Sequence, residues 1–339
     1  SYGIGDKTET IHGNCSPKDF ETMMQLTYLT FTAPRRDDEA FASYKNRSKA
    51  ALLNMEMNPQ IAFSDSIQAG IYMKHPRQVR IKADMIDKMD YDKILSMYND
   101  RYKDASDFTF IFVGNVDVEQ MKPLIVQYLG SLPAINRKET FKDNKVEIRQ
   151  GTYKNEFIRK QETAKASNFV LISGNCEYNL KNDILLDMTS QILDLIYTAK
   201  VREDEGGTYG VYVGGQLRKY PTEKAVLQII FDTAPAKRDK LMKIIFDELN
   251  NFAKAGSTEE NLNKVKEFML KKHAEDLKEN NYWLSGIDEY LFTGMDRIKN
   301  YEQIVNSITM KNIQKFADDL LKQKNEIEVS MISPEAESK

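Results

Sequence analysis

The sequence predicts an α+β protein built from two homologous domains, each with an antiparallel or mixed β-sheet packed by α-helices. Two long-range repeats carry this prediction. Met89–Tyr102 lies 219 positions before Ile308–Leu321, and apolar residues match between them at helical spacing. Ser16–Leu26 lies 218 positions before Ala234–Ile244 with a similar match. The chain therefore contains two copies of one unit.

The first repeat continues without a gap into a strand pattern. Phenylalanine alternates with Thr and Ile over residues 108–112, and apolar residues alternate with Glu and Ser over 327–331 at the same offset. Each copy is therefore predicted to contain a helix followed by a strand.

Two more pairs of helices follow the same order in both copies. Ser16 can cap a helix that has Pro17 at its first position. The next helix is expected at 37–58 in the first copy and at 258–281 in the second, where Thr258 is the expected cap.

The second copy begins with elements whose counterparts in the first copy would lie before residue 1. Asn179 can cap a helix with one apolar face. The expected elements are a strand at 166–176, a helix at 180–202, strands at 209–216 and 225–233, and a turn at 217–223 between these two strands. Subtracting 218 from Arg202 gives a position before residue 1, so the first copy is expected to be truncated and the chain to be a fragment. Because 131–141 resembles an exposed connection, we expect domains at 1–140 and 145–336.

Composition excludes several classes of protein. With 48 basic and 51 acidic residues, the net charge is −3, and the chain lacks the excess of positive charge that is typical of nucleic-acid-binding proteins. No apolar run approaches the roughly 18 residues of a membrane span, so a soluble protein is expected. Cys15 and Cys176 lie far apart and are expected to be buried free thiols.

The corner between Arg202 and Tyr209 is the candidate functional site. A helix ends there, Gly206 and Gly207 turn the chain, and a strand follows. Arg202 offers a fork of donors and Tyr209 a neutral donor, which suits a carbonyl oxygen that gains charge during acyl transfer. The alternative is that Arg202 forms solvated ion pairs with neighbouring acids and Tyr209 is packed surface.

No metal site is expected within this chain. His12, His75 and His273 are the three histidines, and none has a second histidine at ligand spacing. His273 is expected at a helix surface or boundary. Aromatic residues over 282–292 recur at near-helical spacing and are expected in the core.

Three segments resemble the pitrilysin and insulinase family of zinc peptidases. Phe112–Pro133 looks like the strand, turn and helix that close a domain in that family, while Thr30–Asp37 and the Arg202 to Tyr209 corner are similar to its non-catalytic C-terminal half. The similarity extends from about Ser16 to Ile332.

The resemblance implies a clamshell in which two homologous halves enclose a chamber for unfolded peptides. Zinc would be held in the missing N-terminal half by an inverted His-x-x-Glu-His helix, which this chain lacks. In that family the matching tyrosine lies near the tetrahedral oxygen and the arginine on a neighbouring substrate carbonyl, which gives Tyr209 and Arg202 those roles. The implied partners are the catalytic half, in the same protein or another chain, and a peptide substrate, and the implied location is the bacterial periplasm or envelope.

Two functions follow from these observations. The first is the substrate-binding half of a zinc metalloendopeptidase, inactive by itself. The alternative is a structural or binding module of the same fold that takes no part in proteolysis.

Overall fold

The computed structural model describes residues 1–204 and 210–334, and these form two compact units. The first unit consists of Ser1–Asn54 and Ile81–Lys142. The second consists of Met55–Arg80 together with the chain from Asp143 onward. Residues 55–80 thus pack with a part of the chain that follows them by more than sixty positions.

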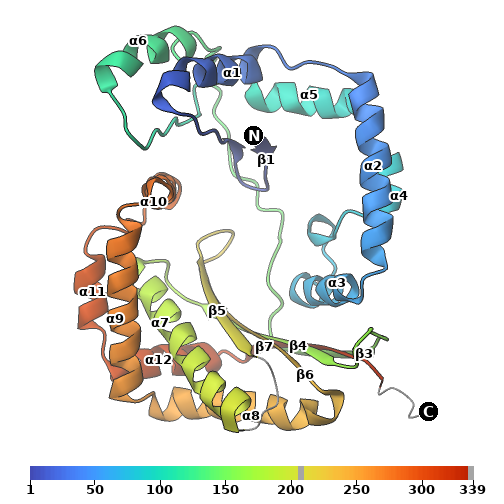
Figure 1. Ribbon diagram of the computed structural model, residues 1–339, viewed down its shortest axis with the longest axis vertical. Helices are drawn as coiled ribbons and strands as arrows, with labels where there is room; N and C mark the ends of the chain where they lie inside the picture. The colour runs from blue at the N-terminus through green and yellow to red at the C-terminus, as the bar shows by residue number, and fades with distance from the viewer. Residues whose placement is uncertain (205–209, 335–339) are drawn as a thin grey trace. The chain divides into compact units, whose positions relative to one another are not determined.

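The first unit is mainly helical (Figure 1). A short antiparallel pair of strands, β1 (Tyr2–Ile4) and β2 (Glu9–Ile11), precedes its helices. Phe31, Tyr102 and Leu132 form a buried cluster in its core. Its helices are η1 (Pro17–Asp19), α1 (Phe20–Thr32), α2 (Asp38–Glu56), α4 (Ala83–Asp87), α5 (Tyr91–Tyr102) and α6 (Val118–Tyr128). The last two residues of α2 already belong to the second unit, because the boundary between the units falls after Asn54.

The strand predicted at 108–112 does not form. The alternation of phenylalanines reflects real packing, since Phe108 contacts the Phe31 ring at 4.9 Å and Phe112 contacts the Phe20 ring at 5.6 Å between centroids. A strand also needs a neighbour to receive its backbone hydrogen bonds. Within the described part of the first unit, no strand pairs with this segment, so it packs without joining a sheet.

The second unit is built on a five-stranded mixed sheet in the order β3-β7-β4-β6-β5. β3 pairs with β7 in parallel, and the other neighbours are antiparallel. The mixed α+β fold class is confirmed, as is the expected β5–β6 pair. The strands are β3 (Thr152–Ile158), β4 (Ala166–Asn175), β5 (Val211–Arg218), β6 (Lys224–Thr233) and β7 (Asn325–Ile332).

Helices cover both faces of this sheet (Figure 1). α7 (Leu180–Tyr197), α8 (Arg238–Ala255) and α12 (Met310–Leu321) pack on one face together with Val170 and Ile172. α3 (Pro59–Tyr72) packs on the other face, where Phe63 and Ile71 contact a cluster that contains Phe169 and Leu171. Consecutive residues of β4 therefore enter opposite cores, as expected for a strand buried on both sides.

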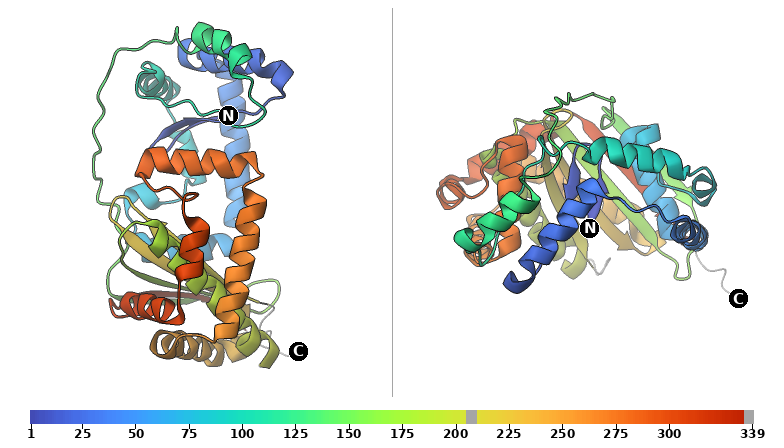
Figure 2. Two further views of the ribbon diagram at one scale, coloured as in Figure 1. Left: turned by 90° about the vertical axis from the view of Figure 1, so that its left-hand side faces the viewer. Right: turned by 90° about the horizontal axis from the view of Figure 1, so that it is seen from above.

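Three further helices belong to the second unit. They are α9 (Glu259–Asp276), α10 (Asn280–Thr293) and α11 (Tyr301–Ser307), and two short 3₁₀ turns, η2 (Pro76–Gln78) and η4 (Pro235–Lys237), belong to the same unit. α10 runs across the end of α9 (Figure 2). Trp283 Nε1 donates to the Leu277 carbonyl at 2.9 Å, at the bend between these two helices. The helix predicted at 258–281 therefore ends five residues early.

Element bounds recur along the chain at nearly constant offsets. η1 and η4 differ by 218 positions, α5 and α12 by 219, and α3 and α10 by 221, with equal lengths within each pair. The caps of α5 and α12, Asp90 and Thr309, also differ by 219 positions and both accept a backbone N–H. This agreement supports the predicted duplication.

Two of the three predicted helix caps are confirmed. The side chain of Asn179 accepts the N–H of Asn182, and that of Thr258 accepts the N–H of Asn261. The prediction that the Ser16 side chain caps a helix is wrong, because its hydroxyl donates to the Asp19 carboxylate at 2.6 Å and accepts no backbone N–H.

Candidate functional site

The predicted Arg202 to Tyr209 corner lies between α7 and β5. α7 ends at Tyr197 and continues as a π-helical turn, η3 (Thr198–Asp204), which includes the backbone of Arg202. Tyr209 and the side chain of Arg202 lie outside the described residues, so their pairing stays a prediction. π-helical turns are rare and frequently occur at functional sites.

Buried groups anchor the turn that carries Arg202. Val201 and Tyr197 are fully buried. The Tyr197 hydroxyl donates to the Ile245 carbonyl at 3.0 Å, which ties the end of α7 to α8. The backbone at Arg202 therefore starts from a well-packed element, as a functional side chain requires.

The strand on the other side of the corner is fastened to α7. Val211 and Val213 are buried in the same core as α7. The Asp194 carboxylate accepts the N–H of Val213, although burial raises the pKa of this acid overall. A Cβ on Gly215 would lie 2.6 Å from Leu186 Cγ, so the glycine permits the close approach of helix and strand.

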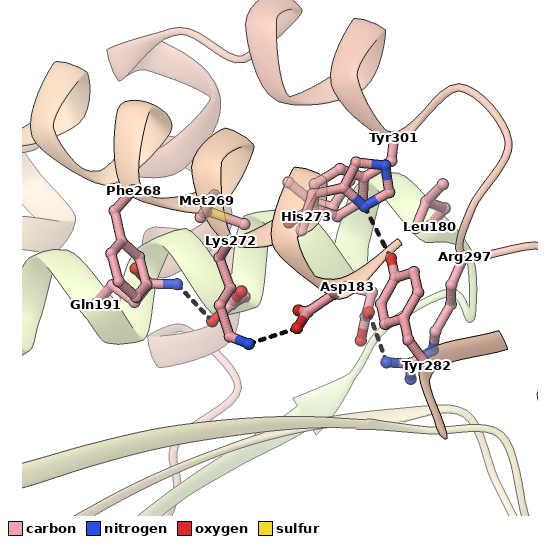
Figure 3. A pocket seen from close by; sticks show the side chains of 13 residues that line it. Leu180, Asp183, Gln191, Phe268, Met269, Lys272, His273, Tyr282, Arg297 and Tyr301 are labelled. Carbon is pink, nitrogen blue, oxygen red and sulfur yellow. Dashed lines mark hydrogen bonds and ion pairs between the residues drawn. The ribbon is translucent and has the colours of Figure 1, made fainter. Parts of the chain in front are cut away.

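A pocket of about 210 Å³ lies elsewhere in the second unit, among α7, α9 and the segment from α10 to α11 (Figure 3). Charged and aromatic side chains line most of it. The lining residues are Leu180, Asp183, Ile184, Asp187, Gln191, Phe268, Met269, Lys272, His273, Asp276, Tyr282, Arg297 and Tyr301. The sequence patterns do not predict this pocket.

His273 forms part of the pocket wall and is not a surface residue, contrary to expectation. It is 5% exposed. Its Nδ1 lies 2.8 Å from the Tyr282 hydroxyl, and its ring stacks on Tyr301 with centroids 4.3 Å apart (Figure 3). Helices α10 and α11, rather than solvent, surround this side of α9.

Arg297 joins the pocket to the loop between α10 and α11. Its guanidinium lies 3.4 Å from an Asp183 oxygen and 2.9 Å from a Glu289 oxygen. Glu289 also accepts the Tyr178 hydroxyl. Burial lowers the pKa of Arg297, but Asp183, Glu289 and Tyr178 together more than offset this effect and leave the pKa raised. Arg297 is thus held as a cation by carboxylates from α7 and α10.

Asp187 lies one helical turn after Asp183 and differs from it in its partners. It accepts a hydrogen bond from Gln191 Nε2 at 2.9 Å. Within the described residues it makes no ion pair. Asp187 is exposed, yet desolvation by the neighbouring helices raises its pKa more than Gln191 and the Arg297 charge lower it.

Other sequence expectations near these sites are corrected by the structure. The aromatic residues of α10 are not core, because this helix has no buried residue, and Trp283 and Tyr290 are 38% and 54% exposed. Cys15 is exposed because it lies in the loop before η1. Cys176 is half-buried, and burial raises the pKa of its thiol to about 11.

The described residues do not bring together three His, Cys, Asp or Glu side chains that could hold a metal ion. His12 is exposed. His75 caps η2 by accepting the N–H of Arg77 at 3.2 Å. Among the described residues, no helix is long and apolar enough to span a bilayer.

Comparison with known sequences identifies the class of protein. A sequence profile described as "Peptidase M16 inactive domain" matches residues 88–269, more than half of the chain. The chain therefore belongs to the peptidase M16 inactive domain family.

Among individual relatives, the chain is similar to proteins described as zinc proteases. It is 22% identical over 287 residues to the "Zinc protease PQQL-like" protein of Arabidopsis thaliana, covering 79% of this chain and 30% of that protein. It is 22% identical over 250 residues to the "Probable zinc protease PqqL" of Escherichia coli K12, covering 73% of this chain and 26% of that protein. The chain spans less than a third of either relative.

Solved structures show the same fold. The periplasmic protease PqqL of Escherichia coli matches with a TM-score of 0.79 at 18% identity, over 94% of this chain and 35% of that one. A peptidase M16 inactive domain from Pseudomonas fluorescens matches with a TM-score of 0.72 at 17% identity, over 96% of this chain and 77% of that one.

Proposed function

We propose that this chain is the substrate-binding C-terminal half of a zinc metalloendopeptidase that cleaves peptides inside a clamshell chamber. The observation that carries the proposal is the match of residues 88–269 to the inactive peptidase M16 domain. The names of the relatives agree with it, since both are described as zinc proteases.

In this proposal the partner is a catalytic half, supplied by the same protein or by another chain. Zinc held there would supply the attacking hydroxide. Tyr209 donates to the oxygen that becomes negative in the transition state, and Arg202 donates to a neighbouring carbonyl of the peptide. The anchored α7 and β5 support this assignment because they fix the backbone on both sides of the corner.

The complete protein is proposed to act in the bacterial periplasm or cell envelope. The support is the description of the Escherichia coli PqqL structure as a periplasmic protease. Finding the complete protein only in the cytoplasmic fraction of its own cells would contradict this location.

The test is Tyr209→Phe in the complete enzyme. Removing one donor to the developing oxyanion should lower kcat by about 100- to 1000-fold. Arg202→Ala should act mainly on KM, because its donors hold a ground-state carbonyl as well. Steady-state kinetics on a fluorogenic peptide measures both, and the 339-residue chain alone should show no hydrolysis.

Tyr212→Phe is the matched control, because Tyr212 lies on β5 and is 55% exposed. Its turnover should stay within about twofold of the unaltered enzyme. Unchanged turnover in Tyr209→Phe would instead favour the alternative function, a structural or binding module.

A further inference from the structure

The pocket between α7, α9 and the α10–α11 segment has a size and a lining suited to a small organic ligand. Cavities of roughly 150 Å³ accept a benzene-sized molecule, and this one measures about 210 Å³. Rings of Tyr282, Tyr301 and Phe268 line it, and Phe268 is 58% exposed. A short alkyl chain can therefore enter and contact aromatic surface.

The charges around the pocket do not balance. Among the lining residues, three carboxylates, on Asp183, Asp187 and Asp276, face two cationic side chains, Lys272 and Arg297. Arg297 is engaged by Asp183 and Glu289, and Lys272 pairs with Asp276. Asp187 is exposed, accepts a hydrogen bond from the neutral Gln191, and makes no ion pair among the described residues, although the Arg297 charge also acts on it.

A carboxylate that makes no ion pair and lies beside aromatic rings attracts a cation. A charge-assisted hydrogen bond to an ammonium or guanidinium group is stronger than the bond to a neutral amide. The ring faces add a cation–π attraction for the same group. A divalent metal is a poorer candidate, because no three-ligand cluster gathers here among the described side chains.

We infer that this pocket binds an alkyl ammonium or alkyl guanidinium group, with Asp187 as its anionic contact and the rings of Tyr282 and Tyr301 around its alkyl chain. The group can come from a lysine or arginine side chain of a peptide or from a free amine. The inference does not rest on the roles of Arg202 and Tyr209 and remains open if these prove wrong.

Trp283 provides the readout. It is the single tryptophan of the chain and follows Tyr282 directly on α10. Titrating the 339-residue chain with n-butylammonium or n-butylguanidinium chloride at constant ionic strength should change Trp283 fluorescence, with Kd of about 1–10 mM for so small a ligand. Calorimetry gives the same Kd independently, and uncharged n-butanol should bind at least about tenfold more weakly.

Asp187→Asn is the decisive variant because it removes the charge and keeps an oxygen that can accept from Gln191. We expect at least about a tenfold loss of affinity for both cations. Asp319→Asn makes the same charge change at an exposed site of α12, where Asp319 pairs with Lys315, and should leave the affinity within twofold. The inference is overturned if neither cation binds at 10 mM, if n-butanol binds equally well, or if Asp187→Asn and Asp319→Asn behave alike.

A blocked pentapeptide with one central lysine separates the two sources of the cation. Tighter binding of this peptide than of n-butylammonium, abolished by acetylating the lysine, identifies a peptide side chain as the ligand. Binding of the free amine without binding of the peptide identifies a free amine. Either result supports a cation site, and binding of the acetylated peptide as tightly as the unmodified one opposes it.

Discussion

At the scale of single residues, Asp104 shows how one carboxylate orders a long connection. It is fully buried in the first unit. Its oxygens accept the hydroxyl of Ser106 at 2.6 Å and the backbone N–H groups of Ser106, Ile135 and Arg137 at 2.7 to 3.0 Å. The Ser106 hydroxyl and these N–H groups hold the pKa of Asp104 well below its usual range. The connection after Leu132 is thus fixed without regular secondary structure.

Asp104→Asn should loosen this connection, because the amide group of Asn places donors against N–H donors. We expect the amides of Ile135 and Arg137 to exchange hydrogen about tenfold faster or more at pH 7. Since the folded pKa is lowered, the stabilisation is present above the ordinary Asp pKa of about 4 and is lost as pH falls through the folded value. Lowering the pH through the folded pKa of Asp104 should therefore reduce the protection factors of these amides, measured against their intrinsic exchange rates, in the unaltered protein and have less effect in the variant.

Asp107→Asn is the matched control, three residues along and exposed. Exchange at Ile135 that is equally fast in both variants would show that charge alone, and not the hydrogen bonds of Asp104, is responsible.

At the scale of elements, the junction of α7 and β5 depends on Gly215. The close approach to Leu186 leaves no room for a side chain there. Gly215→Ala should lower the free energy of unfolding by about 1–3 kcal/mol through overpacking. Chemical denaturation measures this loss.

Gly210→Ala should be nearly neutral, because an added Cβ at that position meets no atom of the described residues within 4 Å. Equal stability of the two variants would mean that Leu186 can move aside and that α7 is not tightly packed on β5.

Helices and strands marked by short sequence patterns were predictable from the sequence, whereas the elements against which they pack were not. Caps such as Asn179 and Thr258 act within three residues, so short patterns reveal them. The wrong predictions of a strand at 108–112 and of a surface position for His273 share a cause. In both cases the outcome depends on which other elements lie beside the residue in the fold. The pocket was missed for the same reason: Asp187 is an ordinary helix residue until α9 and Arg297 are placed beside α7.

At the scale of the whole molecule, the second unit is discontinuous in sequence. α3 covers one face of a sheet whose first strand begins eighty residues after the helix ends. The domain expected at 145–336 therefore lacks a helix that the second unit contains. The bounds 1–140 and 145–336 remain a proposal for the repeat, which is a different division from the packing units.

A fragment spanning 145–336 should expose the apolar face that Phe63 and Ile71 cover. Each of these side chains contributes about 1.5–3 kcal/mol when fully buried. We expect the fragment to bind more of the dye ANS and to melt at a lower temperature than the full chain. A synthetic peptide of residues 55–80 added in trans should reverse both effects.

The same peptide with Phe63→Ala and Ile71→Ala is the control and should have no effect. A fragment that melts like the full chain without any added peptide would show that α3 is dispensable for the second unit.

The position of β7 in the sheet has a consequence for how the chain is made. β7 lies between β3 and β4, although it follows all the other described strands of this sheet in sequence. Until Asn325–Ile332 has left the ribosome, β3 has no neighbour among the described strands to pair with, and the sheet cannot close during synthesis. A stop codon before Asn325 would therefore remove an inner strand rather than a dispensable tail.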